Sequence, residues 1–109
     1  MNNAIMLFCT TPSSEVSEQI SNYLISEHLA ACCNIISGIK SIYRWQGNVE
    51  NDKEDLIIIK TSNEKYNSVE KAIKNLHPYD IPEIIYCSIE GGSIEYLNWI
   101  SQNTQVKHE

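Results

Sequence analysis

The chain contains two uninterrupted apolar runs of strand length, AIMLFC at residues 4–9 and LIII at residues 56–59. A strand with one face in water alternates between apolar and polar side chains, and neither run alternates. We therefore expect both faces of each strand to be covered, which is typical of the central strands of a sheet. The other elements can be placed around these two runs.

Two further segments have apolar residues at helical spacing. The first follows residues 11–14, which offer several N-cap hydroxyls and a proline suited to a first helical turn, and it is predicted to run to about His28. The second follows residues 62–63 and ends at His77, because a residue that precedes proline is pushed out of the helical conformation. Their apolar faces consist of Val16, Ile20, Tyr23 and Leu24 in the first helix and of Tyr66, Val69, Ile73 and Leu76 in the second.

A long strand is predicted over residues 32–45, with Ser37-Gly38 as a bulge or bend. The turn signal at residues 46–48 should return the chain as an antiparallel strand. A fourth strand is expected over residues 82–90, followed by a short helix, and the polar tail at residues 101–109 is expected to be frayed. The apolar residues of the long strand that share one parity are Cys33, Ile35, Ile39, Tyr43 and Trp45.

The resulting order is βαββαβ followed by a terminal helix. Right-handed crossovers convert this order into an α+β, ferredoxin-like fold, in which an antiparallel sheet carries two helices on one face. The first and third strands are central in this topology, and they are the two apolar runs. Because no linker or repeat divides the chain, residues 1–109 are predicted to form a single domain.

Charge and composition limit the possible partners. The 109 residues carry a formal charge of −6 and Arg44 is the single arginine, so a nucleic-acid surface is not expected. No signal peptide or membrane-length apolar stretch is present, and four cysteines without a CxxC motif predict reduced thiols and a cytoplasmic location. The acidic stretch at residues 50–55 is interpreted as a solvated face, with Arg44 and Lys60 solvated or ion-paired.

The apolar central strands also predict an oligomer. Two helices cover one face of the sheet, and the terminal helix is too short to cover the other, so a monomer would expose a large apolar patch. Aromatic residues such as Tyr79 could line a cleft between subunits, although aromatics anchor an interface more often than they bind a small molecule. The residues expected in the subunit interface are Tyr43, Trp45, Trp99 and the pair Ile58 and Ile59, whichever of the two faces the axis.

Six segments, covering nearly the whole chain, carry a resemblance to a known family: CTTP (9–12), LAACCNII (29–36), SIYRWQG (41–47), IKT (59–61), HPYDIPEII (77–85) and YLNWI (96–100). In this order they resemble the CutA family, the divalent-cation tolerance proteins. The resemblance implies a homotrimer of ferredoxin-like subunits whose sheets pack around a common axis, similar in shape to the PII signalling proteins. It also implies a role in tolerance to divalent metal ions, copper especially.

The resemblance further implies a copper site formed by Cys9, His77 and Glu83. A thiolate, an imidazole and a carboxylate are a chemically sensible donor set, and the thiolate favours Cu(I). Some family members carry a second histidine where this chain has Leu76. In the alternative interpretation, Cys9 is a small core residue, His77 ends a helix and interacts with its dipole, and Glu83 is a strand-end residue.

Two classes of function remain open at this point. The first is a protein that binds or responds to metal ions, and the second is a trimeric signalling or scaffold module that binds a small molecule or a protein in its inter-subunit clefts. An enzyme is not expected, because the best dyad, Cys9 with His77, has no recognisable oxyanion site. The Gly91-Gly92 turn lacks the residues of a phosphate-binding loop.

Overall fold

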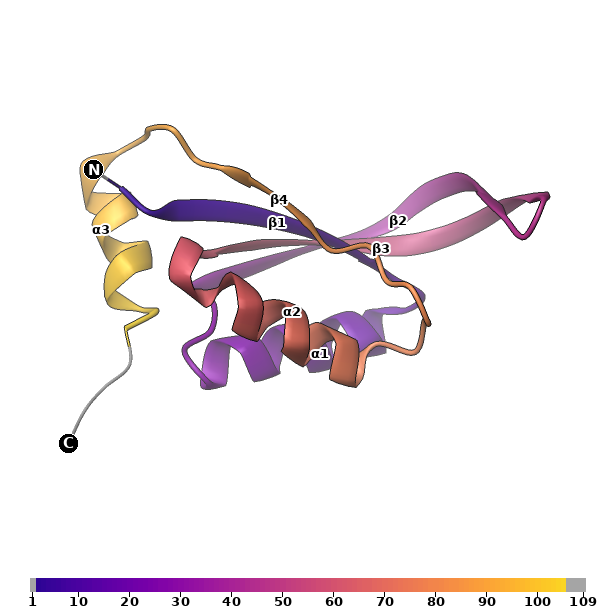
Figure 1. The fold of residues 1–109 in the computed structure, drawn as a ribbon, viewed down its shortest axis with the longest axis horizontal. Helices are drawn as coiled ribbons and strands as arrows, with labels where there is room; N and C mark the ends of the chain where they lie inside the picture. The colour runs from indigo at the N-terminus through magenta and orange to yellow at the C-terminus, as the bar shows by residue number, and fades with distance from the viewer. Residues whose placement is uncertain (1, 106–109) are drawn as a thin grey trace.

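The computed structural model describes residues 2–105 and has the predicted order of elements (Figure 1). No helix within this range is long and apolar enough to cross a membrane. The elements are β1 (Ala4–Thr11), α1 (Ser14–Ser26), β2 (Cys32–Trp45), β3 (Asn48–Ser62), a 3-10 turn η1 (Asn63–Lys65), α2 (Tyr66–Leu76), β4 (Ile85–Ser88) and α3 (Ile94–Gln102).

The four strands form one antiparallel sheet in the order β2-β3-β1-β4. The two apolar runs lie in β1 and β3, so the prediction that they are central is confirmed. Helices α1 and α2 lie side by side on one face of this sheet (Figure 1). The α+β, ferredoxin-like fold expected from the sequence is therefore confirmed. Strand β4 is shorter than predicted because its pairing with β1 runs only from Ile85 to Ser88.

The hydrophobic core lies between the sheet and the two helices. Strands β1 and β3 contribute alternate residues to it, and the helices contribute the apolar faces that the spacing predicted, except for Tyr23, which is 43% exposed. Ile59 belongs to this core and is fully buried within its own chain, whereas Ile58 lies on the opposite face of β3. The best-buried members are Leu7, Cys9, Ile57, Ile59, Ile20, Leu24, Val69 and Ile73.

The β2–β3 hairpin extends well beyond the rest of the sheet (Figure 1). Its tight turn at Gln46-Gly47 has positive φ at both residues, 49° and 83°, which matches the right-handed twist of a hairpin. A bulge lies between Ile36 and Ile39, where Gly38 has φ 77°. The extra residue reverses the parity of β2, so Cys33 and Ile35 face the helices while Ile39, Tyr43 and Trp45 face the other side. The predicted bulge is therefore confirmed, and it divides these five residues of one parity between the two faces of the sheet.

The face of the sheet opposite α1 and α2 remains apolar and partly exposed. We call it the open face and define it by six residues. Within a single chain Ile36 is 46% exposed and Ile85 is 58% exposed. An apolar surface of this extent is typical of a protein interface. The six residues are Met6, Phe8, Ile36, Leu56, Ile58 and Ile85.

Helix α3 lies at the end of the sheet away from the hairpin tip (Figure 1). Ile100 is buried, and the Thr104 hydroxyl lies 2.6 Å from the hydroxyl of Ser62, which joins the segment after α3 to the end of β3. The Lys60 ammonium lies 5.7 Å from the centre of the Tyr96 ring and pairs with no acid among residues 2–105, so the ion-paired alternative of the two roles expected for Lys60 is not observed in this range. Ser101 and Gln102 form the end of α3 and residues 103–104 form a turn, whereas residues 106–109 of the expected tail lie outside the described residues.

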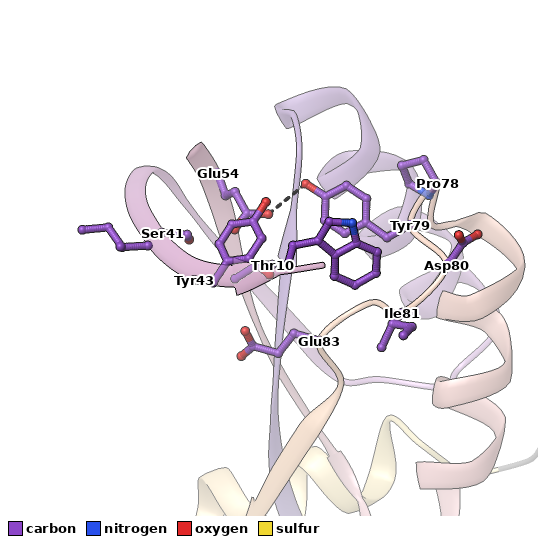
Figure 2. A pocket seen from close by; sticks show the side chains of 11 residues that line it. Thr10, Ser41, Tyr43, Glu54, Pro78, Tyr79, Asp80, Ile81 and Glu83 are labelled. Carbon is purple, nitrogen blue, oxygen red and sulfur yellow. Dashed lines mark hydrogen bonds between the residues drawn. The ribbon is translucent and has the colours of Figure 1, made fainter. Parts of the chain in front are cut away.

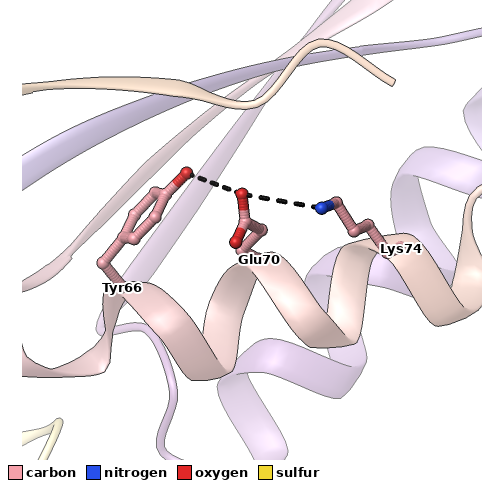
Figure 3. Close-up of polar contacts among 3 residues, drawn as sticks. All are labelled: Tyr66, Glu70 and Lys74. Carbon is pink, nitrogen blue, oxygen red and sulfur yellow. Dashed lines mark hydrogen bonds and ion pairs between the residues drawn. The ribbon is translucent and has the colours of Figure 1, made fainter. Parts of the chain in front are cut away.

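Helix α2 is joined to the edge strand β4 by an aromatic contact. The Tyr66 and Tyr86 rings lie 4.5 Å apart, and the Tyr66 hydroxyl donates to Glu70 over 3.2 Å. Glu70 also pairs with Lys74 one turn further along at 3.8 Å (Figure 3). Such an exposed pair within one helix contributes little to stability.

Neighbouring residues of α1 provide a test of where the core lies. Leu24 is fully buried, whereas Ile25 is 41% exposed. Leu24→Ala should lower the free energy of unfolding by about 2–5 kcal/mol, because it leaves a cavity in the core. Ile25→Ala, its matched control, should change it by less than about 1 kcal/mol. Urea denaturation measures both values, and equal losses would place the core elsewhere.

Candidate acidic pocket and metal-ligating residues

A cavity of about 660 Å³ lies between the β2–β3 hairpin and the segment that leads from α2 to β4. Figure 2 shows side chains from both sides converging on it. The hairpin contributes one wall, residues 78–83 contribute the other, and the end of β1 forms the base. The lining residues are Thr10, Ser41, Ile42, Tyr43, Trp45, Glu54, Pro78, Tyr79, Asp80, Ile81 and Glu83.

The bulge at Gly38 determines which residues of β2 face this pocket. Because it reverses the parity of β2, Tyr43 and Trp45 lie on the same face of the hairpin as Glu54. The proline-containing segment after α2 cannot continue the helix and instead crosses the end of β1, which brings Tyr79 against the hairpin.

Glu54 is the most buried acid of the pocket, with only 7% of its surface exposed. The Tyr79 hydroxyl donates to its Oε2 over 3.0 Å, and Figure 2 shows this bond across the pocket. The Tyr43 hydroxyl donates to the carboxylate of Asp52 on the neighbouring strand. Two tyrosines therefore hold two carboxylates in place from opposite sides.

The pocket has a negative electrostatic potential. The hydrogen bond to Asp52 raises the pKa of Tyr43 to about 12, with burial and nearby acids acting in the same direction. Burial, reinforced by Glu54, also raises the pKa of Tyr79 and that of the Glu83 carboxyl. None of the residues that line the pocket is lysine, arginine or histidine. A cation would be the charged species favoured here.

Cys9, the first residue of the predicted copper site, lies in the core on the helix-covered face. Its side chain has no exposed surface, and its Sγ contacts the carbonyl oxygen of Thr10 at 3.7 Å. Burial raises the pKa of the thiol to about 12, and the charges of Glu83 and Glu54 act in the same direction. Because the thiolate is the form that binds metal, this environment opposes metal binding by Cys9.

His77, the second residue of that site, uses both ring nitrogens for backbone hydrogen bonds. The Tyr79 N–H donates to Nδ1 over 3.1 Å, so Nδ1 carries the lone pair and the proton lies on Nε2. Nε2 donates to the Thr10 carbonyl over 2.8 Å. That carbonyl lies beyond the β1–β4 ladder, so the imidazole provides it with a partner. Neither nitrogen offers a free lone pair to a metal.

Glu83, the third residue, is exposed and lines the pocket. The structure therefore brings Cys9 and His77 to the same backbone carbonyl, whereas Glu83 lies with Glu54 and Asp80. Across residues 2–105 no three His, Cys, Asp or Glu side chains are grouped closely enough to hold a metal ion. The residues of the predicted copper site do not form one as they stand.

The predicted interface residues lie in three places. Tyr43 and Trp45 line the pocket and are 39% and 41% exposed, and Ile58 belongs to the open face. Ile59 is buried in its own chain, so Ile58 is the one of the pair that faces outward. Trp99 lies on α3 with its ring 5.5 Å from that of Tyr96.

The burial of the hairpin acids was not predicted from the sequence. Residues 50–55 were interpreted as a solvated charge run, yet Glu54 and Asp55 are 7% and 6% exposed. Both residues directly precede the apolar run at residues 56–59 in the same strand. This position was a signal for burial, because residues next to a buried segment of a strand lie close to the core. The bond from Tyr79 to Glu54 had no local signal, since 25 residues separate them.

A split βαβ sheet with one helix-covered face and a long overhanging hairpin defines an α+β, ferredoxin-like domain. Residues 5–103 match the family described as CutA1 divalent ion tolerance protein. The chain therefore belongs to the CutA divalent ion tolerance family, as its motifs predicted.

Individual relatives agree with this assignment. The chain is 44% identical to the divalent-cation tolerance protein CutA of Thermus thermophilus, over 91% of this chain and 96% of that protein. It is 40% identical to a chloroplastic CutA 1 of rice, over 94% of this chain and 58% of that protein. The structure superposes with a TM-score of 0.92 on CutA from Xylella fastidiosa, at 37% identity, covering 94% of this chain and 99% of that one. A protein from Archaeoglobus fulgidus titled periplasmic divalent cation tolerance protein gives 0.91 at 37% identity, with the same two coverages.

Burial of Cys9 gives a pH-dependent prediction. A pKa of about 12 in the folded chain, against 9.0 for the free thiol, means that the folded state holds the proton more tightly. This contribution to stability is complete below about pH 9 and is lost as the pH rises towards 12. Cys9→Ala should therefore reduce the loss of stability over this window, as measured by urea denaturation at several pH values.

In the wild type, mass spectrometry should find Cys9 unalkylated at pH 8 until the chain is unfolded. Rapid alkylation of folded Cys9 would contradict its placement.

Proposed function

We propose that this member of the divalent ion tolerance family is a homotrimeric metal-binding protein, rather than an enzyme, that binds divalent ions in its acidic pocket. The observation that carries the proposal is that Glu54, Asp80 and Glu83 line one cavity whose lining contains no basic residue. Because the three carboxylates are not close enough to hold one ion together, the proposed site uses one or two of them with water as the remaining ligands. Carboxylate oxygens are effective ligands for divalent cations, and water can complete the coordination in a cavity of this size. The cytoplasmic location expected from the sequence remains a prediction.

Copper remains the preferred metal under this proposal, with a different donor set. The thiolate set predicted from the sequence would select Cu(I), but Cys9 is buried and the His77 nitrogens are occupied. Oxygen donors bind Cu(II), and among first-row divalent ions a given site generally binds Cu(II) most tightly. The chemistry of the pocket therefore supports the order Cu(II), then Zn(II), then Mg(II).

The open face supports the homotrimer. Its apolar side chains extend across all four strands, and α3 lies at the sheet end rather than over them. Packing against the same face of other subunits would remove this surface from water, at roughly 25 cal/mol for each Å² buried. The overhanging hairpin would then lie beside a neighbouring subunit, close to the mouth of the pocket.

The donor set can be tested by substitution. Glu54→Gln should weaken Cu(II) binding about tenfold or more, because it removes the buried charge while preserving shape. Cys9→Ser should leave Cu(II) affinity unchanged. Isothermal titration without thiol reductant measures both, with Zn(II) and Mg(II) as comparison ions.

Glu18→Gln is the matched control, since Glu18 is an exposed carboxylate on α1. It should bind Cu(II) like the wild type. If Glu54→Gln binds normally while Cys9→Ser loses Cu(I) affinity in a chelator competition, the metal lies at the sequence-predicted residues and the acidic pocket is not the site.

The assembly is tested at the open face. Ile58→Asp would place an unpaired charge in the subunit interface and should abolish the trimer while circular dichroism stays folded. Sedimentation equilibrium should then give a mass near 12.4 kDa rather than three times that value. Ile25→Asp, on the exposed side of α1, should remain trimeric. A wild-type chain that sediments as a monomer would contradict the proposal.

A further inference from the structure

The pocket is larger than a metal ion requires. At about 30 Å³ for each water molecule, an ion with six waters occupies roughly 180 Å³. The cavity measures about 660 Å³, within the range of sites that bind organic molecules. The pocket therefore has room for a larger ligand, and its carboxylates form only part of its lining.

Three aromatic residues form much of the remainder. Tyr43, Trp45 and Tyr79 are 39%, 41% and 37% exposed, so each presents part of its ring to solvent in the single chain. Tyr43 and Trp45 come from the hairpin and Tyr79 from the opposite wall. Figure 2 shows Tyr43 and Tyr79 on either side of the Glu54 carboxylate. Aromatic faces beside carboxylates are the combination that recognises an organic cation.

The hydrogen bonds of Glu54 leave room for a donor from a ligand. Its Oε2 accepts from Tyr79, while no donor among residues 2–105 bonds to its Oε1. That oxygen is also not among the fully enclosed, unpartnered atoms of the described residues, so part of its surface is accessible. An ammonium group has three N–H donors and can bond to Oε1 while it lies against an aromatic face.

From this geometry we infer that the pocket binds a primary alkylammonium ion, with a diammonium chain as the best fit. One ammonium group lies between Glu54 and the aromatic rings, and the second reaches Asp80 or Glu83 on the other wall. The alkyl chain between them packs against Ile81 and Trp45. This inference goes beyond the proposed function and does not require that a metal bind.

Other ligand classes fit the pocket less well. An anion would be repelled by three carboxylates and would find no lysine, arginine or histidine in the lining. A neutral polyol could use the same hydrogen-bonding groups, but it would gain neither the cation–π attraction nor the charge-assisted bond to Glu54. A diammonium ion uses both walls.

The test compares 1,4-diaminobutane with butane-1,4-diol, which has the same length and no charge. Isothermal titration is performed on the full-length protein after metal has been removed with a chelator. The diamine should bind at least about tenfold more tightly than the diol, and its affinity should fall as salt is raised. n-Butylamine should bind with intermediate affinity, because it has a single charge.

Two variants assign the binding to this pocket. Trp45→Leu should weaken diamine binding about fivefold by removing an aromatic face, and Glu54→Gln should weaken it about tenfold. The matched controls are Tyr23→Leu, which removes an equally exposed ring on α1, and Glu18→Gln. Both controls should bind the diamine like the wild type.

The outcomes separate this inference from the proposed function. Equal affinity for the diamine and the diol would overturn the inference. Unchanged diamine affinity in both pocket variants would also overturn it. Neither outcome depends on whether the protein binds Cu(II). If the protein binds the diamine but does not bind Cu(II), the inference is supported and the metal proposal is overturned. If a neighbouring subunit fills the pocket, the wild type will bind no diamine, and the inference fails.

Discussion

The antiparallel pairing of β1 with β3 is the constraint on which the rest of the molecule depends. Eight pairs, from Ala4 with Ser62 to Thr11 with Asp55, align the two most apolar segments of the chain. Because side chains alternate between faces, this register directs Ile57 and Ile59 towards the helices and Ile58 towards the open face. A slip of one residue would exchange these faces. The same pairing therefore determines both the core of the chain and the apolar open face on its other side.

The bulge at Gly38 has the equivalent role for the pocket. Up to Ile36, β2 continues the alternation of the central strands, and beyond the bulge its parity is reversed. Without the extra residue, Tyr43 and Trp45 would lie on the opposite face of the hairpin from Glu54. The positive φ of Gly38 makes this arrangement accessible at little conformational cost. One residue inserted in an edge strand thus builds an aromatic wall around a buried acid.

The fold could be predicted from the sequence because each element carries its own periodicity. The runs at residues 4–9 and 56–59, the helical spacing and the proline after His77 are local signals, and the topology follows from their order. The site could not be predicted in the same way. Burial of Glu54 depends on strand register, and its bond to Tyr79 joins distant segments. The hydrogen bonds of His77 depend on where β4 stops pairing with β1, which no local pattern specifies.

The arrangement of charges would allow one pocket to bind both kinds of cation proposed above. Glu54 is almost fully buried, and its protein partner is a neutral hydroxyl rather than a basic side chain. A buried charge without a counter-charge is unfavourable, so a cation of either chemistry would offset a cost that the fold itself imposes. Burial and the charge of Glu54 raise the pKa of Glu83, and a bound cation opposes both effects. Cation binding is therefore coupled to release of a proton from Glu83 where that group is still protonated, and the occupied state gains relative stability as the pH rises.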